Sequence, residues 1–402
     1  MEYTPQEVLQ YIREEDVKFI RLAFCDVFGR PKNISISHKE VERAFTTGIA
    51  IDASAIAGFG DEVHSDLFLH PDPATLSVLP WRPEHGRVVR MYCAITHPDG
   101  TPFAHDTRQI LKDAIADGEK AGCRFAFGAE MEFYLFRLDE NGDPTAIPYD
   151  RATYMDVAPE DKCENVRREI CLTLEQMGIQ PESSHHEEGP GQNEIDFRYS
   201  DALTAADNAM TFRTVVSTIA ARNGLYADFS PKPIADAPGS GFHINISVKG
   251  EGENLQEHMM AGILERAADM TLFLNPSDRS YHRLGTHKAP KYISWSSDNR
   301  SQLIRIPAAS GQYRRVELRS PDCTANPYLA FALLIWAGLE GIRNQIPAPA
   351  ASNVNLFRAS QSETAQLQML PLSLTAASRK AASSEFIARC LPQSLTARFC
   401  RD

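Results

Sequence analysis

Two short runs of charged residues alternate with apolar ones, as residues on a β-strand do. In the run 315–319 (Arg-Val-Glu-Leu-Arg), alternation places two guanidinium groups and one carboxylate on the same face of a strand. Glu130 and Glu132 alternate in the same way inside the apolar run 125–136. Arginines beside a carboxylate suit an anion held next to a metal ion. The two runs therefore predict strands that line a site.

Three further segments carry residues of the same chemical kinds. In the segment 185–194, a Gly-Pro-Gly turn could fold Glu187 and Glu194 toward one point. A Gly-Ser-Gly loop at 239–241 leads into a strand whose alternation exposes the polar residues His243, Asn245 and Ser247. The segments 280–283 and 299–305 contribute the arginines Arg283, Arg300 and Arg305. Carboxylates, one imidazole and several arginines together indicate a site for hard divalent cations and phosphates, which is the chemistry of phosphoryl transfer.

Each of these segments also has a structural interpretation when it is taken alone. A Glu-x-Glu pair can be a solvated strand face, and Glu187 with Glu188 can be an exposed loop. Short glycine loops mostly make turns, and a single histidine such as His243 is more often a hydrogen-bonded core residue than a ligand. The run 315–319 could be a surface ladder of ion pairs. The joint occurrence of the segments favours a site.

Composition limits the class of protein. The chain has 402 residues, 43% of them hydrophobic, so it can bury a large core. A formal net charge of −12 disfavours nucleic acid as a partner. The sequence has no apolar run long enough for a membrane helix and no secretory signal, and the eight cysteines are scattered singly. We therefore expect a cytoplasmic protein with reduced cysteines and no membrane partner.

The pattern of elements predicts an α+β fold in two domains, at 1–100 and 101–402, separated by a turn cluster at 97–102. We expect strands near 18–24 and 86–95, and a loop with surface helix at 345–375. An amphipathic helix is expected at 106–121 and further helices at 161–177 and 202–223, each ending at a glycine, with a buried apolar helix at 329–342.

The order and wording of these segments resemble the glutamine synthetase family from about residue 16 to residue 342. The most specific match is 232–247, which begins Lys-Pro-Ile, contains Gly-Ser-Gly-Phe-His and fits the family's ATP-region signature. The resemblance implies a small N-terminal β-grasp domain and a larger catalytic domain with a curved antiparallel sheet and flanking helices. It also implies a homo-oligomeric ring, a hexamer or a stacked dodecamer, with active sites between subunits.

The resemblance also assigns roles to residues by position. It implies two Mg²⁺ or Mn²⁺ ions, one held by Glu132, Glu187 and Glu194 and the other by Glu130, His243 and Glu317. It implies phosphate contacts from Arg300, Arg305 and Arg315, nucleotide contacts from Asn245 and Ser247, and glutamate contacts from Arg283, Arg319 and Gly239. The implied reaction activates L-glutamate with ATP as an acyl phosphate, and an amine, ammonia in the family, then displaces phosphate.

The sequence departs from the family pattern where ammonium is bound. Asp52 and Tyr154 match the family's N-terminal acid and tyrosine. The flap, residues 284–290 (Leu-Gly-Thr-His-Lys-Ala-Pro), is one residue shorter and carries Lys288 where the family has glutamate. A cation there should repel ammonium.

Several interpretations of Lys288 stay open. A neutral Lys288, or the neighbouring His287, could act as the base. The chain could instead be a γ-glutamyl amide ligase that uses another small amine. Lys288 could also be an exposed flap residue, with ammonia entering through Asp52 and Glu187. A non-catalytic, ring-forming structural or regulatory protein is the remaining alternative.

Overall fold

The computed structural model describes residues 3–60, 63, 65–82, 85–308 and 315–400. Contacts within the chain divide it into two compact units. Unit 1 comprises Met1–Ile110 with Leu172–Ile179, and unit 2 comprises Leu111–Cys171 with Gln180–Asp402. Helices accompany a mostly antiparallel sheet in both units, so the predicted α+β class is confirmed.

Unit 1 is built on a six-stranded sheet. In sheet order its strands are β2 (Pro31–Ser37), β1 (Val17–Cys25), β6 (Arg87–Thr96), β4 (Asp66–Pro71) and β3 (Ile49–Asp52), with β5 (Ser77–Val78) against β6. The pair of β1 and β6 is parallel and the other pairs are antiparallel. The strands predicted at 18–24 and 86–95 correspond to β1 and β6 and are confirmed.

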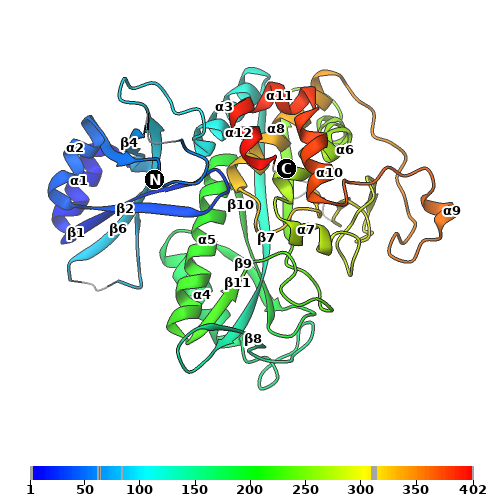
Figure 1. The fold of residues 1–402 in the computed structure, drawn as a ribbon, viewed down its shortest axis with the longest axis horizontal. Coiled ribbons are helices and arrows are strands. Elements are labelled where there is room, and N and C mark those ends of the chain that lie inside the picture. The colour runs from blue at the N-terminus through cyan, green and yellow to red at the C-terminus, as the bar shows by residue number, and fades with distance from the viewer. Residues whose placement is uncertain (1–2, 61–62, 64, 83–84, 309–314, 401–402) are drawn as a thin grey trace. The chain divides into compact units, whose positions relative to one another are not determined.

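Short helices accompany this sheet. They are α1 (Pro5–Glu14), the 3₁₀ turns η1 (His38–Glu40) and η3 (Pro73–Thr75), and α2 (Val41–Thr46). A capping box starts α1, because the Thr4 side chain accepts from Glu7 N while the Glu7 carboxylate accepts from Thr4 N. The apolar face of α1 buries Val8 and Ile12 beside β1 (Figure 1). Local capping and burial of an apolar face together explain this helix.

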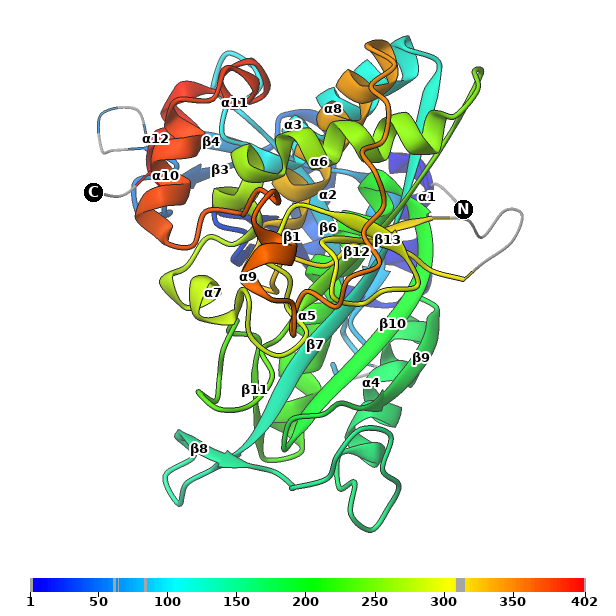
Figure 2. The ribbon, with the colours of Figure 1, turned by 90° about the vertical axis from the view of Figure 1, so that its right-hand side faces the viewer.

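Unit 2 is built on a nine-stranded sheet that carries the charged strands predicted from the sequence. In sheet order the strands are β13 (Trp295–Ser297), β14 (Ile304–Ile306), β15 (Val316–Leu318), β12 (Phe242–Gly250), β7 (Cys123–Leu138), β10 (Gln192–Asp201) and β9 (Pro181–His186). Two more, β8 (Pro144–Pro148) and β11 (Leu225–Asp228), also pair with β7. Figure 2 shows β7, β10 and β9 side by side. Among the described strands of this sheet, β13 and β14 pair in parallel and the other pairs are antiparallel.

Glycines end three of the predicted helices where the sequence predicts. The helices from residue 107 onward are α3 (Thr107–Lys120), α4 (Glu164–Gln176), α5 (Ala202–Arg222), α6 (Leu255–Leu274), α7 (Asp278–Arg283), α8 (Pro327–Arg343), α9 (Gln361–Thr364), α10 (Leu374–Ala382), α11 (Glu385–Cys390) and α12 (Gln393–Phe399). Gly122, Gly178 and Gly224 follow α3, α4 and α5 at positive φ. The start predicted for α4 at Asp161 was wrong, because Asp161 accepts from Cys163 N in the preceding loop.

Helix α8 is almost wholly buried, as its apolar sequence predicts. It packs closely on α6, since a Cβ added at Gly262 would lie 2.2 Å from Ala337 O and one at Gly341 would lie 2.0 Å from His258 O. On its other side Phe331 stacks on Phe127 of β7, with ring centroids 4.3 Å apart. The helix therefore links the sheet to the outer helices.

Three further expectations concern membrane helices, the cysteines and the segment 345–375 in the residues that the structure describes. Within them, no helix combines the length and the apolar character that crossing a membrane requires. Five of the eight cysteines are buried: Cys25, Cys93, Cys123, Cys163 and Cys323. The segment 345–375 contains only α9 and the start of α10, in agreement with the predicted loop and surface helix.

Candidate active site

Cross-strand register gathers acidic residues of unit 2 on one face of the sheet. Glu130 on β7 lies opposite His243 on β12 and opposite Asp196 on β10. Glu132, two residues along β7, lies opposite Glu194 on β10. Because directly opposite and alternate residues share a face, the register sets these five side chains around one centre.

Glu317 on β15 stands between cationic groups. It lies opposite Asn245 on β12 and opposite Arg305 on β14. Its carboxylate is fully buried, with Oε2 accepting from Arg305 Nη1 at 2.5 Å and Oε1 accepting from Arg319 Nη1. His243 Nδ1 lies 3.8 Å from Glu317 Oε1. Two charge-assisted hydrogen bonds hold the carboxylate in one orientation.

The side chains that could hold a divalent cation form overlapping groups. In each group the potential ligand atoms lie within 4.8 Å of one another: Glu130, His243 and Glu317; Glu132, Glu194 and His243; His185, Glu187 and Glu194; and Glu130, Glu194 and Asp196. The first group is one of the two sets predicted from the sequence. Glu132 and Glu187, predicted to act in one set with Glu194, each join Glu194 in a separate group.

Two members of these groups, His185 and Asp196, were given no role from the sequence. His185 Nε2 lies 3.4 Å from Glu187 Oε1 and 3.7 Å from Glu194 Oε1. Asp196 follows Glu194 by two residues on β10, and its Oδ1 is buried without a hydrogen-bond partner among the described residues. Strand alternation around Glu194 is the signal that could have identified Asp196.

Burial and mutual repulsion oppose full ionisation of the acidic residues. Burial, and then the charge of Asp196, raises the pKa of Glu194. Burial, and then the charge of Glu130, raises the pKa of Asp196 to about 7. Burial also acts on Glu130, but hydrogen bonds from His243 and Asn245 outweigh it and hold the pKa of Glu130 below its usual range. A divalent cation would relieve this repulsion, and the oxygen-rich donor set fits Mg²⁺ or Mn²⁺.

A glycine loop fits around a buried arginine beside these acids. Arg283, at the end of α7, donates through Nη1 to Ser320 O at 2.7 Å and through Nη2 to Arg319 O at 3.3 Å. A Cβ at Gly239 would lie 2.8 Å from Arg283 Cγ, and one at Gly241 would lie 2.8 Å from Arg283 Nη2. Only glycine leaves room at both positions for this guanidinium.

A cavity of about 570 Å³ brings most of the predicted site residues together. Its lining includes Glu130, Glu132, Tyr154, Glu187, Glu194, Gly239, His243, Arg283, Lys288, Arg300, Arg305, Arg315 and Arg319. Glu317 lies behind it against Arg305, and Asn245 accepts from Arg315 Nε at 2.8 Å.

Three predicted residues of unit 2, Asn245, Ser247 and Glu317, are not among the residues that line the cavity. Ser247 lies farther along β12, two residues beyond Asn245. Asp52 belongs to unit 1, where its carboxylate accepts from Ser54 N at 2.9 Å and from Ser54 Oγ at 2.7 Å. A role for Asp52 at the cavity therefore stays a prediction.

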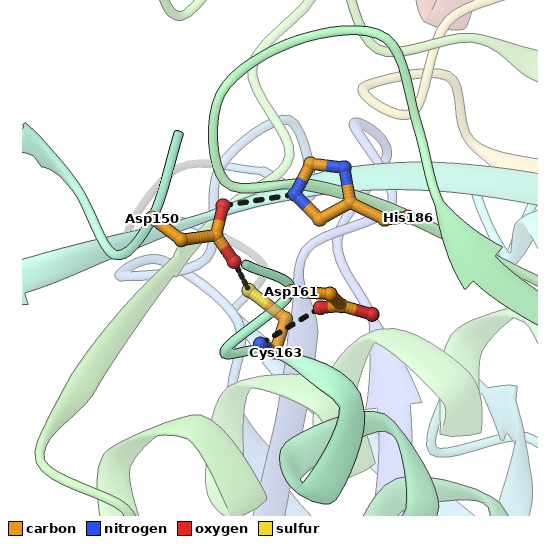
Figure 3. Close-up of side chains that lie close together, drawn as sticks. All are labelled: Asp150, Asp161, Cys163 and His186. Atoms are coloured by element: carbon orange, nitrogen blue, oxygen red, sulfur yellow. Dashed lines mark hydrogen bonds and ion pairs between the residues drawn. The ribbon is translucent and has the colours of Figure 1, made fainter. Parts of the chain in front are cut away.

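A buried hydrogen-bonded cluster supports the turn between β9 and β10. Figure 3 shows Asp150 between His186 and Cys163, with Asp150 Oδ1 2.9 Å from His186 Nε2 and Oδ2 accepting from Cys163 Sγ at 3.2 Å. Gly191 N also donates to Asp150 Oδ1, at 3.0 Å. On the other side of the imidazole, His186 Nδ1 lies 2.6 Å from the carbonyl oxygen of Glu187. Asp150 therefore ties together the two ends of the turn.

Asp161 and Arg167 extend this cluster toward β10. Both side chains are buried, and Arg167 Nη2 donates to Asp161 Oδ2 at 2.5 Å. Arg167 Nη1 donates to Asn193 Oδ1 at 2.7 Å, directly before Glu194. The four residues of Figure 3 are close enough to suggest a metal site, but their polar atoms serve these bonds and the Arg167 charge opposes a cation. The cluster is structural, and the sequence alone gave no signal for it.

The flap places its lysine beside a carboxylate. Lys288 Nζ lies 2.6 Å from Glu188 Oε1 and 5.4 Å from the centroid of the Tyr154 ring. Tyr154 meets His185 edge to face, with centroids 5.3 Å apart. The sequence pattern indicates for Glu188 only a place in an exposed loop. Its contact with Lys288 brings together two residues one hundred positions apart, which no local pattern could predict.

Two family models match the chain. The model described as "Glutamine synthetase, beta-Grasp domain" matches residues 16–98, and the model described as "Glutamine synthetase, catalytic domain" matches residues 104–401. A glutamine synthetase of Clostridium saccharobutylicum is 45% identical over 375 residues, which cover 90% of this chain and 85% of that protein. A glutamine synthetase of Methanosarcina mazei is 44% identical over 412 residues, which cover 98% of this chain and 92% of that protein.

Solved structures agree with this fold. A structure titled as a complex of GmaS with ADP has a TM-score of 0.87 and 28% identity, covering 98% of this chain and 93% of that chain. A cryo-EM structure of Plasmodium falciparum glutamine synthetase has a TM-score of 0.87 at 21% identity, covering 100% of this chain and 95% of that chain, and it bears on the fold alone. The predicted β-grasp and catalytic folds are confirmed. The chain belongs to the glutamine synthetase family.

Proposed function

We propose that this protein is an ATP-dependent ligase that joins L-glutamate to ammonia through a γ-glutamyl phosphate. The observation that carries the proposal is one cavity in which overlapping acidic groups meet five arginines, in a chain 45% identical to a glutamine synthetase. Carboxylate and amine do not condense usefully in water, so the carboxylate must first be activated. Convergent acidic and arginine groups support phosphoryl transfer as that activation.

Metal ligation is assigned to the acidic groups. We assign Mg²⁺ or Mn²⁺ to Glu130, Glu132, Glu187, Glu194, His243 and Glu317, with ligand atoms within 4.8 Å of one another inside each close group. Such ions, when bound, neutralise charge on the transferring phosphoryl group. His185 and Asp196 face the same cavity and belong to the same groups.

Substrate binding is assigned to the arginine side of the cavity. Arg300, Arg305 and Arg315 would contact the phosphates of ATP, and Asn245, which accepts from Arg315, and Ser247 would contact the nucleotide. Arg283, Arg319 and Gly239 would hold the carboxylates of glutamate, because a planar guanidinium can grip a carboxylate bidentately.

The amine step is assigned to Asp52, Tyr154 and Lys288. The position of Lys288 on the flap is the observation that supports a second candidate function, that of a γ-glutamyl amide ligase acting on another small amine. We further propose a cytoplasmic protein, a domain boundary near residue 100, and a ring of subunits, either a hexamer or a stacked dodecamer, with sites completed between neighbours.

The decisive experiment measures glutamate-dependent phosphate release from ATP with Mg²⁺, comparing ammonium with small amines, amino acids and polyamines. Ammonium as the best substrate would support the ligase proposed first. A preferred substituted amine would support the γ-glutamyl amide ligase. Metal-dependent ADP binding without phosphate release under any condition would instead favour a structural or regulatory protein.

Mn²⁺ affinity is expected to rise as the pH increases from about 5 to about 7.5, because bound cation must displace protons from carboxyl groups. The pKa values of Glu194 and Asp196 are raised in the folded protein, so these groups stabilise it below their unfolded pKa and lose that contribution as pH rises. Bound cation should offset the loss. Calorimetric titration at several pH values measures the affinity.

A charge-neutral variant tests the assignment of this pH dependence. Asp196→Asn should flatten the slope of Mn²⁺ affinity against pH, whereas the exposed-site variant Glu160→Gln should retain it. An equal slope in the unmodified protein and both variants would show that cation binding does not displace a proton from Asp196.

A further inference from the structure

A lysine ammonium group is held at the rim of the cavity by an acid and an aromatic ring. Lys288 Nζ lies 2.6 Å from Glu188 Oε1 and 5.4 Å from the Tyr154 ring centroid. The Lys288 side chain is 50% exposed and that of Glu188 is 37% exposed. Ion pairs at such exposure are weak, so another cation can replace this one.

The groups around Lys288 Nζ would suit any small ammonium ion. Carboxylates and the faces of aromatic rings attract ammonium groups, and a lysine side chain ends in a primary alkylammonium. Glu188 directly follows Glu187, which lies farther into the cavity with Glu194. A cation at this position therefore stands beside the acidic centre proposed for the reaction.

The flap departs from the family pattern in the sign of its charge, and an acid on a neighbouring turn faces it. The family pattern puts an acid on the flap, whereas here the flap carries Lys288 and the opposing turn supplies the acid as Glu188. The negative group needed near the incoming ammonium is therefore present, although it comes from another segment of the chain.

We propose that Glu188 and Tyr154 form the subsite for the incoming ammonium or small primary alkylammonium ion, and that Lys288 occupies this subsite as an internal competitor when no amine is bound. The inference rests on the proposed ligase function. The substrate cation displaces Lys288 Nζ from Glu188, and the lysine side chain, already half exposed, turns toward solvent. Glu188 is thus a specificity-determining residue and Lys288 sets the concentration of amine that is required.

Opposite changes in the KM for ammonium test this competition. Lys288→Gln removes the competitor and should lower that KM by about two- to fivefold, while Glu188→Gln removes the acid and should raise it by about the same factor. The KM for glutamate should move no more than in the exposed control variants Lys249→Gln and Glu251→Gln. A merely structural role for the ion pair would shift both KM values in one direction in both variants.

The outcomes separate this inference from the proposed function. An unchanged or raised ammonium KM in Lys288→Gln, with normal turnover in the unmodified protein, would overturn the competition and leave the ligase assignment intact. Absence of glutamate-dependent turnover in the unmodified protein would overturn the ligase assignment, and with it the role of the subsite in catalysis.

A second measurement tests displacement of the lysine without requiring turnover. The rate of Lys288 acetylation, followed by peptide mass spectrometry, should increase relative to Lys249 in tetramethylammonium chloride compared with sodium chloride at equal concentration. Equal relative rates in the two salts would contradict displacement of Lys288 by an ammonium cation.

Discussion

Glu317→Gln is expected to reduce glutamate-dependent phosphate release by on the order of a thousandfold. The Glu317 carboxylate is fully buried and accepts from Arg305 and Arg319, with His243 beside it. Glutamine has almost the same shape but no charge. The substitution therefore removes the carboxylate that positions both guanidinium groups and that is assigned as a metal ligand. Steady-state kinetics with a thermal melt of each variant would measure the effect.

Glu340→Gln provides a matched control for this substitution. Glu340 also pairs with two arginines, Arg266 and Arg389, but it does not line the 570 Å³ cavity. Its loss can affect stability through these surface contacts, whereas phosphate release by the folded fraction should stay near that of the unmodified protein. A Glu317→Gln variant that retained activity within about tenfold would remove Glu317 from the assigned machinery.

Asp150→Ala is expected to lower the free energy of unfolding by about 3–5 kcal/mol, the usual cost of breaking a buried ionic pair. The substitution removes the acceptor used by Gly191 N and Cys163 Sγ, and the partner of His186. Burial opposes ionisation, but the contact with His186 holds the pKa of Asp150 at about 2. Urea denaturation followed by circular dichroism would measure the change.

The same substitution should also weaken the turn that carries Glu187 and precedes Glu194. We expect Asp150→Asn to cost less than Asp150→Ala, because the amide keeps one acceptor oxygen. The exposed-site variant Asp143→Ala should keep the denaturation midpoint of the unmodified protein. If Asp150→Ala behaved like Asp143→Ala, the cluster of Figure 3 would have no supporting role.

Local sequence patterns predicted the elements whose causes are local. Glycines at positive φ end α3, α4 and α5, and alternation placed Glu130 and Glu132 together at the cavity. The same alternation predicted the common direction of Arg315 and Arg319. These features depend on residues a few positions apart, so a single sequence contains the information.

Features that depend on distant partners were not predictable in this way. The start of α4 was misplaced because Asp161 lies in the loop before the helix, where its carboxylate accepts from Cys163 N and pairs with Arg167. Asp196 joins the acidic groups only through the register of β10 against β7. Glu188 meets Lys288 because two loops approach each other in the folded chain. In each case the partner is set by strand pairing or tertiary packing rather than by sequence neighbours.

The sharing of residues among the acidic groups makes them one thermodynamic unit. Glu194 belongs to three of the close groups and His243 to two. A cation that engages Glu194 in one group changes the charge experienced in the others, and linkage requires that this influence be reciprocal. Successive cations should therefore bind with unequal, mutually dependent affinities, and replacing Glu194 should alter every step of the titration rather than delete one.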